Sequence, residues 1–424
     1  MTEIGEIPQE WGFVKLGDVL SLIKNGVTYK QNKKDSGYPV TRIETISEEK
    51  IDTAKVGYID NIKTENINDY RLIEGDILFS HINSLEHIGK TAIYEGEPEL
   101  LLHGMNLLLL RSDKSKIEPS YLVYSLKFYR AKELFKSMAK RAVNQASINQ
   151  TELKRIKIPL PPLPEQQKIA EILSTADDEI QKMDEQIALA EQLKKGLMQK
   201  LLTRGIGHTR FKTTEIGEIP EEWEIKKIKD ISTYVTDGTH KTPHYIEEAQ
   251  SGVPFISTEN IKPYSNEFDF SRYKRYIDEI SYKELSKRAK PEKGDLLISK
   301  CGTIGRTQLI RNDIKIGIFV GLLLVKIKNN TVSGQYFEDL LNSDKYRTIM
   351  ESISPGSTRK TLAIGMFKNI LIPLPPLQEQ QKIAEILTTV DNKLELLGNK
   401  REKLNVLKKG LMDDLLTGKV RVKV

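Results

Sequence analysis

The segment Ile158 to Leu173 reads IPLPPLPEQQKIAEIL, and Ile372 to Leu387 reads IPLPPLQEQQKIAEIL, one difference between two segments that lie 214 positions apart. Proline lacks an amide donor and fixes φ, so PLPPL predicts a stiff extended connector. Pro164 suits the first turn of a helix, and Glu165 is favourable at the positive end of the helix dipole. Each copy therefore predicts an extended connector that leads directly into a helix.

The helix after each connector is unusually long. Residues 165–202 contain no proline and one glycine, Gly196, which predicts a helix of about 38 residues. Apolar residues recur at alternating spacings of four and three, which is a heptad seam, and the second copy keeps it at all but one position, Arg401. The seam residues that we name are Ile169, Leu173, Ile180, Met183 and Ile187 in the first helix and Ile383, Leu387, Val390, Leu394 and Leu397 in the second. The economical arrangement is that the two helices pair with each other as an antiparallel coiled coil, with one globular domain at each end.

The repeat extends through the whole chain of 424 residues. Thr2 to Trp11 (TEIGEIPQEW) returns as Thr214 to Trp223 (TEIGEIPEEW), whereas residues 12–157 and 224–371 have diverged almost completely. We therefore predict a first globular domain over 1–157, a connector and long helix over 158–204, a second globular domain over 205–371, and a second connector and helix over 372–424. Near-identical ends and dissimilar middles suggest one scaffold that presents two different readers.

Each globular domain is expected to belong to the α+β class. Short segments rich in β-branched residues precede a helical stretch in both halves. The strand candidates are Val40–Ile46, Asp76–Ser80 and Leu100–Arg111 in the first half and Val253–Ser257, Asp295–Ser299 and Ile316–Ile327 in the second. The helical candidates are Pro119–Arg141 and Gly334–Ser352.

Composition narrows the class of protein. The chain carries a net charge of +6, has 29% charged residues and contains one cysteine, Cys301, so an intramolecular disulfide is excluded and a cysteine-based metal site is not favoured. No stretch approaches 18 apolar residues, and the N-terminus does not have the layout of a signal peptide, which predicts a cytoplasmic location and no membrane contact. The positive charge is compatible with nucleic acid but does not by itself indicate it.

No catalytic, cofactor-binding or metal-binding constellation is recognised. The sequence has no Gly-rich phosphate loop followed by Gly-Lys-Ser/Thr, and its six histidines show no metal-ligand spacing that both halves share. His240 and His244 are four apart, but Pro243 between them is unsuited to a helix interior. An enzymatic role is therefore not favoured.

Polar side chains that can read DNA bases concentrate where the two halves diverge. Three pairs of segments correspond between the halves: 24–30 and 236–242, 80–84 and 299–303, and 141–148 and 355–362. Ordinary polar loops would explain any one of these segments, but all three together favour a binding surface. The DNA-binding candidates are Asn25, Thr28, Lys30, His81, Asn83, Arg141, Asn144 and Gln145 in the first half and Thr236, Thr239, His240, Lys241, Lys300, Thr303, Arg306, Ser357, Thr358, Arg359 and Lys360 in the second.

This arrangement resembles the specificity subunit of type I restriction-modification systems. The resemblance spans the whole chain and rests on TEIGEIPxEW, on the duplicated PLPPLxEQQKIAEIL, on the repeated LKKGLM…LLT, and on the segments GDIL (75–78) and GDLL (294–297). It implies two target-recognition domains that each contact one half of a split site in double-stranded DNA, with a spacer set by the helix pair.

The resemblance also implies a division of labour between subunits. Two modification subunits that bind S-adenosylmethionine would dock on the helix faces outside the seam and methylate adenine, and restriction subunits would cleave DNA after ATP-driven translocation. This chain would hold no cofactor. Replacing Arg359 by Ala is expected to alter only the half-site read by the second domain. The alternative is a coiled-coil scaffold that holds two protein-binding domains apart.

Overall fold

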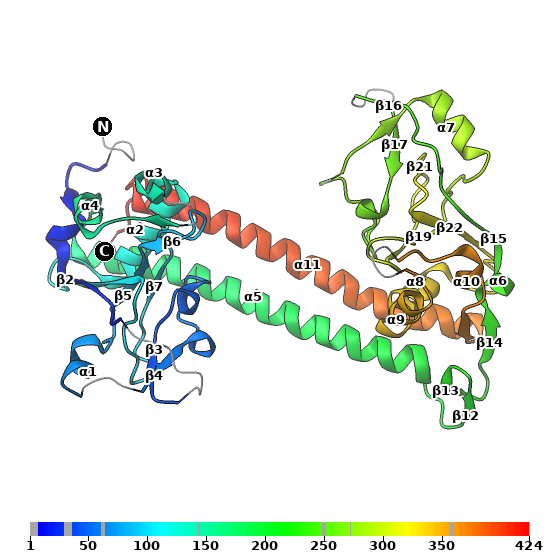
Figure 1. Cartoon of the computed structure of the whole chain (residues 1–424), viewed down its shortest axis with the longest axis horizontal. Coiled ribbons are helices and arrows are strands. Elements are labelled where there is room, and N and C mark those ends of the chain that lie inside the picture. The colour runs from blue at the N-terminus through cyan, green and yellow to red at the C-terminus, as the bar shows by residue number, and fades with distance from the viewer. Residues whose placement is uncertain are drawn as a thin grey trace. The chain divides into compact units, whose positions relative to one another are not determined.

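The protein divides into two compact units that share both long helices. The computed structural model describes residues 7–28, 36–60, 64–141, 145–247, 252–271, 273–356 and 360–423, with 64–66 as backbone only. Unit 1 consists of residues 1–184 and 400–424, and unit 2 of residues 185–399. Helices α5 (Leu163–Arg204) and α11 (Leu377–Leu416) each contribute one segment to each unit (Figure 1). The expected α+β class, with two globular domains and two long helices, is confirmed.

Unit 1 is built around a four-stranded antiparallel sheet of order β2-β8-β5-β7. Its strands are β2 (Leu20–Asn25), β5 (Ile77–Ser80), β7 (Thr91–Ile93) and β8 (Leu107–Ser112). Alternate side chains of β5 and β8 pack into two different clusters, one against helix α2 (Pro119–Ala131) and one on the opposite face. Because both faces are buried, these strands are continuous apolar runs rather than alternating ones. The smaller elements are β3 (Tyr38–Val40), β4 (Gly57–Ile59), α1 (Thr64–Tyr70), β6 (Ile82–Asn83), α3 (Leu134–Met138), β9 (Lys140–Arg141), β10 (Ala146–Ser147) and α4 (Gln150–Arg155).

Unit 2 repeats this plan with a sheet of order β15-β22-β19-β20. Its strands are β15 (Ser232–Asp237), β19 (Leu296–Ser299), β20 (Thr307–Leu309) and β22 (Leu322–Ile327), and helices α8 (Gly334–Asn342) and α9 (Asp344–Ser352) pack on one face. The other elements are β12 (Phe211–Thr214), β13 (Gly217–Pro220), α6 (Ile228–Ile231), β16 (Tyr245–Ile246), β17 (Val253–Ile256), β18 (Tyr276–Ile277), α7 (Glu279–Ser286), β21 (Gly317–Ile318) and α10 (Ile364–Lys368).

The Pro-rich connectors are paired strands rather than free spacers. In unit 1, β11 (Lys157–Leu160) pairs antiparallel with β1 (Gly12–Lys15), and in unit 2, β23 (Leu371–Leu374) pairs with β14 (Glu224–Lys227). Each of these sheets has only two strands, so every strand has an open edge on which a proline costs no ladder hydrogen bond. The connector therefore ties the start of each globular domain to the start of its long helix.

Three of the expected strands are shorter or divided. Val40–Ile46 is strand only at its first residue, and Glu44–Ile46 is a 3-10 helix. In Leu100–Arg111 the strand starts at Leu107, after Asn106 adopts a left-handed φ of 70°. The equivalent Ile316–Ile327 divides into β21 and β22. In the last two segments the cause is that one apolar run serves two layers in turn, first a small outer layer and then the central sheet.

Within each unit the two helix segments run antiparallel. In unit 1, Lys408 Nζ lies 2.5 Å from Asp177 Oδ1, and Arg401, the exception in the seam, pairs with Asp184. In unit 2, Lys194 Nζ lies 2.5 Å from Asp391 Oδ1. Asp391 and Lys408 follow Asp177 and Lys194 by 214 positions, so the two ion pairs are copies of one contact in which the helices exchange roles.

The seam residues are buried to different degrees. Ile169 and Leu173 lie in the core of unit 1 beside Leu415 and Leu416, and Ile383 and Leu387 lie in that of unit 2 beside Leu201 and Leu202. The helix ends therefore pack into the globular domains as well as against each other. Of the remaining seam residues, Met183, Val390 and Leu397 are buried, and Ile180, Ile187 and Leu394 are half-buried.

The first turn of each long helix is fixed by a buried glutamine and by a glutamate that is buried in unit 1 and half-buried in unit 2. Gln166 Oε1 accepts from Glu118 N and its Nε2 donates to Pro161 O, and Gln380 makes the equivalent bonds with Ser333 N and Pro375 O. Trp11 Nε1 donates to Glu165 at 3.1 Å, and Trp223 Nε1 donates to Glu379 at 3.0 Å. The conserved EQ pair and the two tryptophans of the repeat are thus parts of one helix-start motif.

The third partner of this glutamate differs between the units. In unit 2 it is His208, from the chain between helix and strand, whose Nε2 lies 2.9 Å from Glu379. In unit 1 it is Arg421, near the end of the chain, which donates to both oxygens of Glu165 and to Glu10. The segment that follows α11 therefore completes the helix start of unit 1.

Replacing Arg421 by Ala is expected to loosen unit 1 alone, because Glu165, only 3% exposed, would lose both guanidinium bonds. Hydrogen exchange measured by mass spectrometry should speed up in peptides that cover 7–28 and stay unchanged in those that cover 211–227. Lys423→Ala, an exposed residue of the same tail, is the matched control. Equal protection in Arg421→Ala and Lys423→Ala would show that the tail contributes nothing to unit 1.

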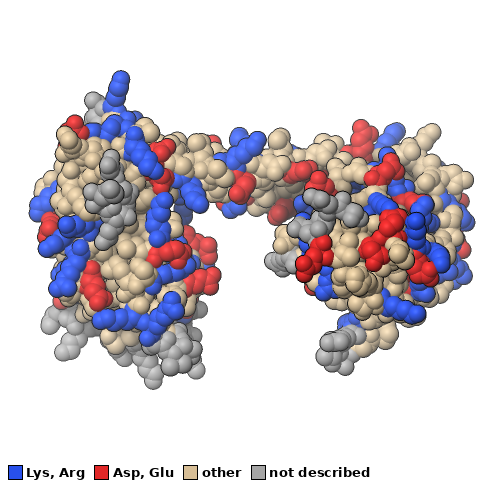
Figure 2. Space-filling model, turned by 90° about the horizontal axis from the view of Figure 1, so that it is seen from above, with Lys and Arg blue, Asp and Glu red and all other residues tan. Residues whose placement is uncertain are grey.

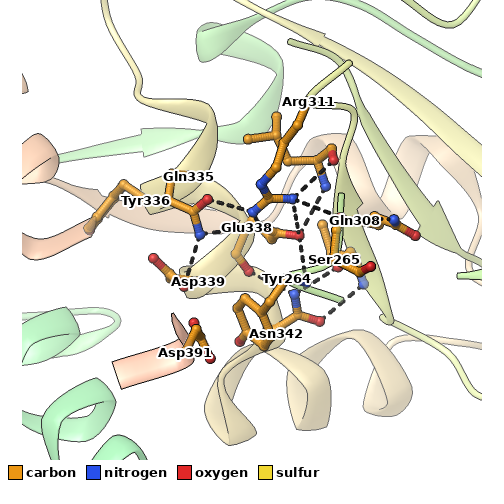
Figure 3. A network of polar contacts seen from close by, with 12 residues as sticks. Tyr264, Ser265, Gln308, Arg311, Gln335, Tyr336, Glu338, Asp339, Asn342 and Asp391 are labelled. Carbon is orange, nitrogen blue, oxygen red and sulfur yellow. Dashed lines mark hydrogen bonds and ion pairs between the residues drawn. The ribbon is translucent and has the colours of Figure 1, made fainter. Parts of the chain in front are cut away.

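Unit 2 contains a buried polar network centred on Glu338 (Figure 3). The sequence of unit 1 has no acidic residue at the position equivalent to Glu338. Glu338 on α8 is fully buried and accepts hydrogen bonds from Arg311, from Tyr264 N at 3.1 Å and from Leu309 N at 3.0 Å. Tyr336 and Tyr121 make the same bond to the connector in the two units, from their hydroxyl groups to Pro373 O and Pro159 O. Counting from these tyrosines, unit 1 has Val123 where unit 2 has Glu338.

Candidate nucleic-acid interface

In unit 1 the three candidate segments meet at one end of the central sheet. Asn25, at the end of β2, and Ser80, at the end of β5, pair with Leu108 and Leu107 at the start of β8. Directly beyond, Asn83 of β6 pairs with Ala146 of β10. Segments more than 100 residues apart in sequence thus form one surface.

In unit 2 the same three segments meet in the same way. Asp237 of β15 and Ser299 of β19 pair with Leu323 and Leu322 of β22. The third segment joins through Leu362, whose N donates to Lys300 O at 2.8 Å, as Ile148 N donates to His81 O at 2.9 Å in unit 1. The two surfaces are therefore equivalent in backbone and different in side chains.

A glycine follows the first strand at each surface for a steric reason. A Cβ on Gly26 would lie 1.9 Å from Gly104 O, and one on Gly238 would lie 2.2 Å from Ile318 O. Such distances forbid any side chain, because the chain passes directly against the backbone of the outer layer. These two glycines fix the path of the loop that presents the next residues.

The candidate residues are exposed to different degrees. Asn25, Thr28, Arg141, Gln145, His240, Lys241, Thr303 and Lys360 are exposed, whereas Asn83, Lys300 and Arg306 are half-buried and His81, Thr236 and Thr239 are buried. Lys30, Asn144, Ser357, Thr358 and Arg359 lie outside the described residues. The exposed members can meet DNA directly, and the buried ones can act only through their neighbours or after movement.

The half-buried candidates are already engaged within the protein. Asn83 Nδ2 donates to Ser80 Oγ at 3.0 Å, and the Arg306 guanidinium donates to Ile261 O. These bonds hold the loops after β5 and β19 in place. In the free protein, Asn83 and Arg306 therefore support the surface rather than project from it.

His81 is neutral at physiological pH. Burial lowers its pKa to about 4, and it lies 8% exposed with Nδ1 unpartnered among the described residues. A neutral imidazole cannot neutralise a phosphate, so an ionic role for His81 is excluded while it stays buried. Its ring remains able to make a neutral hydrogen bond.

Two residues of the unit 2 surface were missed in the sequence. Asp237 lies within the candidate segment 236–242 but is not among the DNA-binding candidates, and it accepts from Lys300 Nζ at 2.5 Å and from the guanidinium of Arg288. Arg288 follows α7, 51 positions away, within the basic run SKRAKP (286–291). A basic run is ordinary on a surface, and only the fold brings it to the sheet end.

Charges of both signs share the molecular surface. On the face drawn in Figure 2, Lys and Arg are interspersed with Asp and Glu over both units.

No group of three or more His, Cys, Asp or Glu among the described residues is arranged to hold a metal ion. In the part of the chain that the structure describes, no helix is both long and apolar enough to cross a membrane.

The chain is a duplicated protein in which each unit presents a surface with the same backbone arrangement but different side chains. The family model described as the type I restriction modification DNA specificity domain matches residues 8–192 and again 220–406. The chain belongs to this family, as a specificity subunit.

Individual relatives agree with the family model over the whole chain. A putative type I restriction enzyme MjaX specificity subunit of Methanocaldococcus jannaschii is 45% identical over 428 residues, which cover 100% of this chain and 96% of the relative. The MjaVIII specificity subunit of the same organism is 30% identical, with 98% and 94% covered. The crystal structure of an S subunit from M. genitalium superposes with a TM-score of 0.60 at 16% identity, with 98% and 99% covered, which supports the fold.

Proposed function

We propose that this chain recognises a bipartite DNA target for a type I restriction-modification complex, with one half-site read by each unit. The observation that carries the proposal is the equivalence of the two sheet-end surfaces, since each joins the same three segments but presents different polar side chains. The match of a DNA specificity domain to each half supports it further. The alternative of a protein-binding scaffold is not favoured, because that match names DNA in both halves.

Recognition would divide between positioning and reading. Exposed cations such as Arg141, Lys241 and Lys360 suit phosphate oxygens, which makes affinity fall with salt. Exposed Asn25, Gln145 and Thr303 offer donors and acceptors suited to base edges. The described surface supplies both kinds of side chain in each unit, as a reader of sequence requires.

The partners would be the modification and restriction subunits of such a system. In each unit, leucines at equivalent places on the long helices are exposed: Leu193 (53%) in unit 2 and Leu407 (56%) in unit 1. Leu189 and Leu396 in unit 2 and Val406 in unit 1 are also exposed on these helices. We place the docking of two modification subunits on these helix faces.

Catalysis would belong to the partners. This chain would act as a non-catalytic subunit, with S-adenosylmethionine on the modification subunits and ATP on the restriction subunits. We infer that it acts in the cytoplasm, where bacterial DNA and the proposed partners would be met.

The test is methylation profiling of bacterial DNA after this chain is expressed with its neighbouring modification subunit, by sequencing that detects N6-methyladenine. We expect a single motif made of two specific halves and an unspecific spacer of fixed length. A modification subunit that is active with another specificity subunit, but yields no bipartite motif with this one, would contradict the proposal.

A further inference from the structure

A single buried carboxylate organises the sheet end of unit 2. Asp237 is 3% exposed and receives Lys300 Nζ at 2.5 Å, the Arg288 guanidinium, and His240 Nε2 at 3.3 Å. These three donors come from the residue after β19, from the segment after α7 and from the loop after β15. The carboxylate therefore ties the segment after α7 to the loops at the end of the central sheet.

The cluster carries more positive than negative charge. Burial raises the pKa of Asp237, but the hydrogen bonds from Lys300 and Arg288 outweigh burial and hold the pKa below its ordinary value of 3.8, so the carboxylate is ionised at neutral pH. Two permanent cations share it, and no other acid is paired with Lys300 or Arg288 among the described residues. One positive charge is left uncompensated at this place.

That charge is presented by Arg288. Lys300 is only 12% exposed, whereas the side chain of Arg288 is 51% exposed. Arg288 Nε donates to Asp237 O at 3.2 Å and Nη2 donates to the Asp237 carboxylate. One edge of the guanidinium is fixed, and Nη1 has no partner among the described residues, so its planar fork is oriented before any ligand arrives.

Unit 1 has no such cluster at the equivalent register. Asn25 stands where unit 2 has Asp237, since their partners Leu108 and Leu323 occupy the same place on the central strand. His81, which is neutral, stands where unit 2 has Lys300. The ion cluster is thus a property of the second reader, not of the shared scaffold.

We propose that Arg288 contacts DNA in the half-site read by unit 2, and that Asp237 is the positioning residue that orients Arg288 and also binds Lys300 and His240. This inference rests on the proposed function. The ligand chemistry is a pair of adjacent oxygen or nitrogen acceptors, which a phosphate group or the O6 and N7 of guanine both supply.

The first test replaces Arg288, which is exposed enough to change without loss of the fold. Binding of the complex with its modification subunits is measured by fluorescence anisotropy on four duplexes: the intact target, targets altered in half-site 1 or half-site 2, and an unrelated sequence. If the ligand is guanine, Arg288→Ala weakens the intact target about ten- to hundredfold and removes the preference at one base pair of half-site 2. If the ligand is phosphate, Arg288→Ala weakens binding to all four duplexes to a similar extent. It also reduces the slope of log affinity against log salt concentration by about one.

Replacing Asp237 separates positioning from simple charge. Asp237→Asn keeps the shape, adds one net positive charge and releases the guanidinium. If guanine is read, we expect binding of the unrelated duplex to be unchanged or tighter, while discrimination at half-site 2 falls about tenfold or more and discrimination at half-site 1 is retained. Arg288→Lys keeps the charge but not the planar fork. If guanine is read, its loss of discrimination at half-site 2 should resemble that of Arg288→Ala.

Glu224→Gln is the matched control, because it makes the same charge change in an exposed ion pair of the same unit. Wild-type binding to all four duplexes in Arg288→Ala would overturn the contact. Equal loss at both half-sites in Asp237→Asn would overturn the positioning role. Failure of the wild-type complex to show any bipartite preference would instead refute the proposed function.

Discussion

Replacing Glu338 by Ala is expected to destabilise unit 2 by about 3–5 kcal/mol, because it leaves the largely enclosed Arg311 without its counter-ion. Arg311 is 19% exposed and Glu338 is fully buried. The backbone N–H groups of Tyr264 and Leu309 would lose their acceptor as well (Figure 3). Unfolding in urea can be followed for unit 2 alone by Trp223 fluorescence in a Trp11→Phe background, since the chain has two tryptophans, one in each unit.

The control for this prediction comes from unit 1, where Val123 holds the place of Glu338. The double variant Glu338→Val, Arg311→Met removes both charges together, and its cost should be clearly smaller than that of Glu338→Ala. A double variant as unstable as the single one would mean that the network stabilises through its backbone bonds and not through the ion pair.

Replacing Asp339 by Asn is expected to stabilise unit 2 increasingly as the pH rises. Burial, and then the charge of Glu338, raise the pKa of Asp339 well above its ordinary value of 3.8. The folded state therefore keeps a proton that the unfolded chain releases. Stability is lost as the pH rises from 3.8 to the folded pKa, at about 1.4 kcal/mol per pH unit. Asn does not titrate, so the variant escapes this loss.

Contacts around Asp339 give the same protonation state. Gln335, on the same helix as Asp339, donates to Asp339 Oδ1 at 3.5 Å, whereas Asp339 Oδ2 has no partner among the described residues. On α11, Asp391 pairs with Lys194 through Oδ1, and its Oδ2 also has no partner among the described residues. In unit 1 the equivalent residue is Tyr124, whose hydroxyl donates to Asp177 Oδ2 at 2.9 Å. A proton on Asp339 would take the place of that hydroxyl.

The measurement is the free energy of unfolding of wild type and Asp339→Asn between pH 5 and pH 8, again from Trp223 in a Trp11→Phe background. The gap between the two proteins should widen as the pH rises from 5, until the pH reaches the folded pKa of Asp339. Asp344→Asn, which changes a carboxylate that is 79% exposed on α9, should show no such trend. A constant gap for Asp339→Asn would mean that Asp339 is ionised in the folded state.

The architecture was predictable because its determinants are local and duplicated. Periodicity over tens of residues predicts the long helices, and the identity of the two copies predicts two units. The prediction of one strand over residues 100–111 was wrong, because a strand buried on both faces has the same composition as a chain that passes from one layer to another. Only Asn106, in a left-handed conformation, marks the boundary.

The candidate site was predictable as a set of segments but not as a set of side chains. Divergence between matched halves located all three segments that the sheet brings together. It could not reveal that His81 is buried and neutral, or that Arg288 joins the surface, because both depend on tertiary contacts. The role of Asp237 depends on Arg288 and was missed with it.

The order of the two units along the chain has a consequence for synthesis on the ribosome. Unit 2 is one continuous stretch, 185–399, whereas the core of unit 1 includes Leu415 and Leu416, and its helix start is closed by Arg421. Unit 2 can therefore be complete while residues 400–424 of unit 1 have not yet been translated. A message cut short before Leu415 would yield a protein whose second reader is finished and whose first reader lacks part of its core.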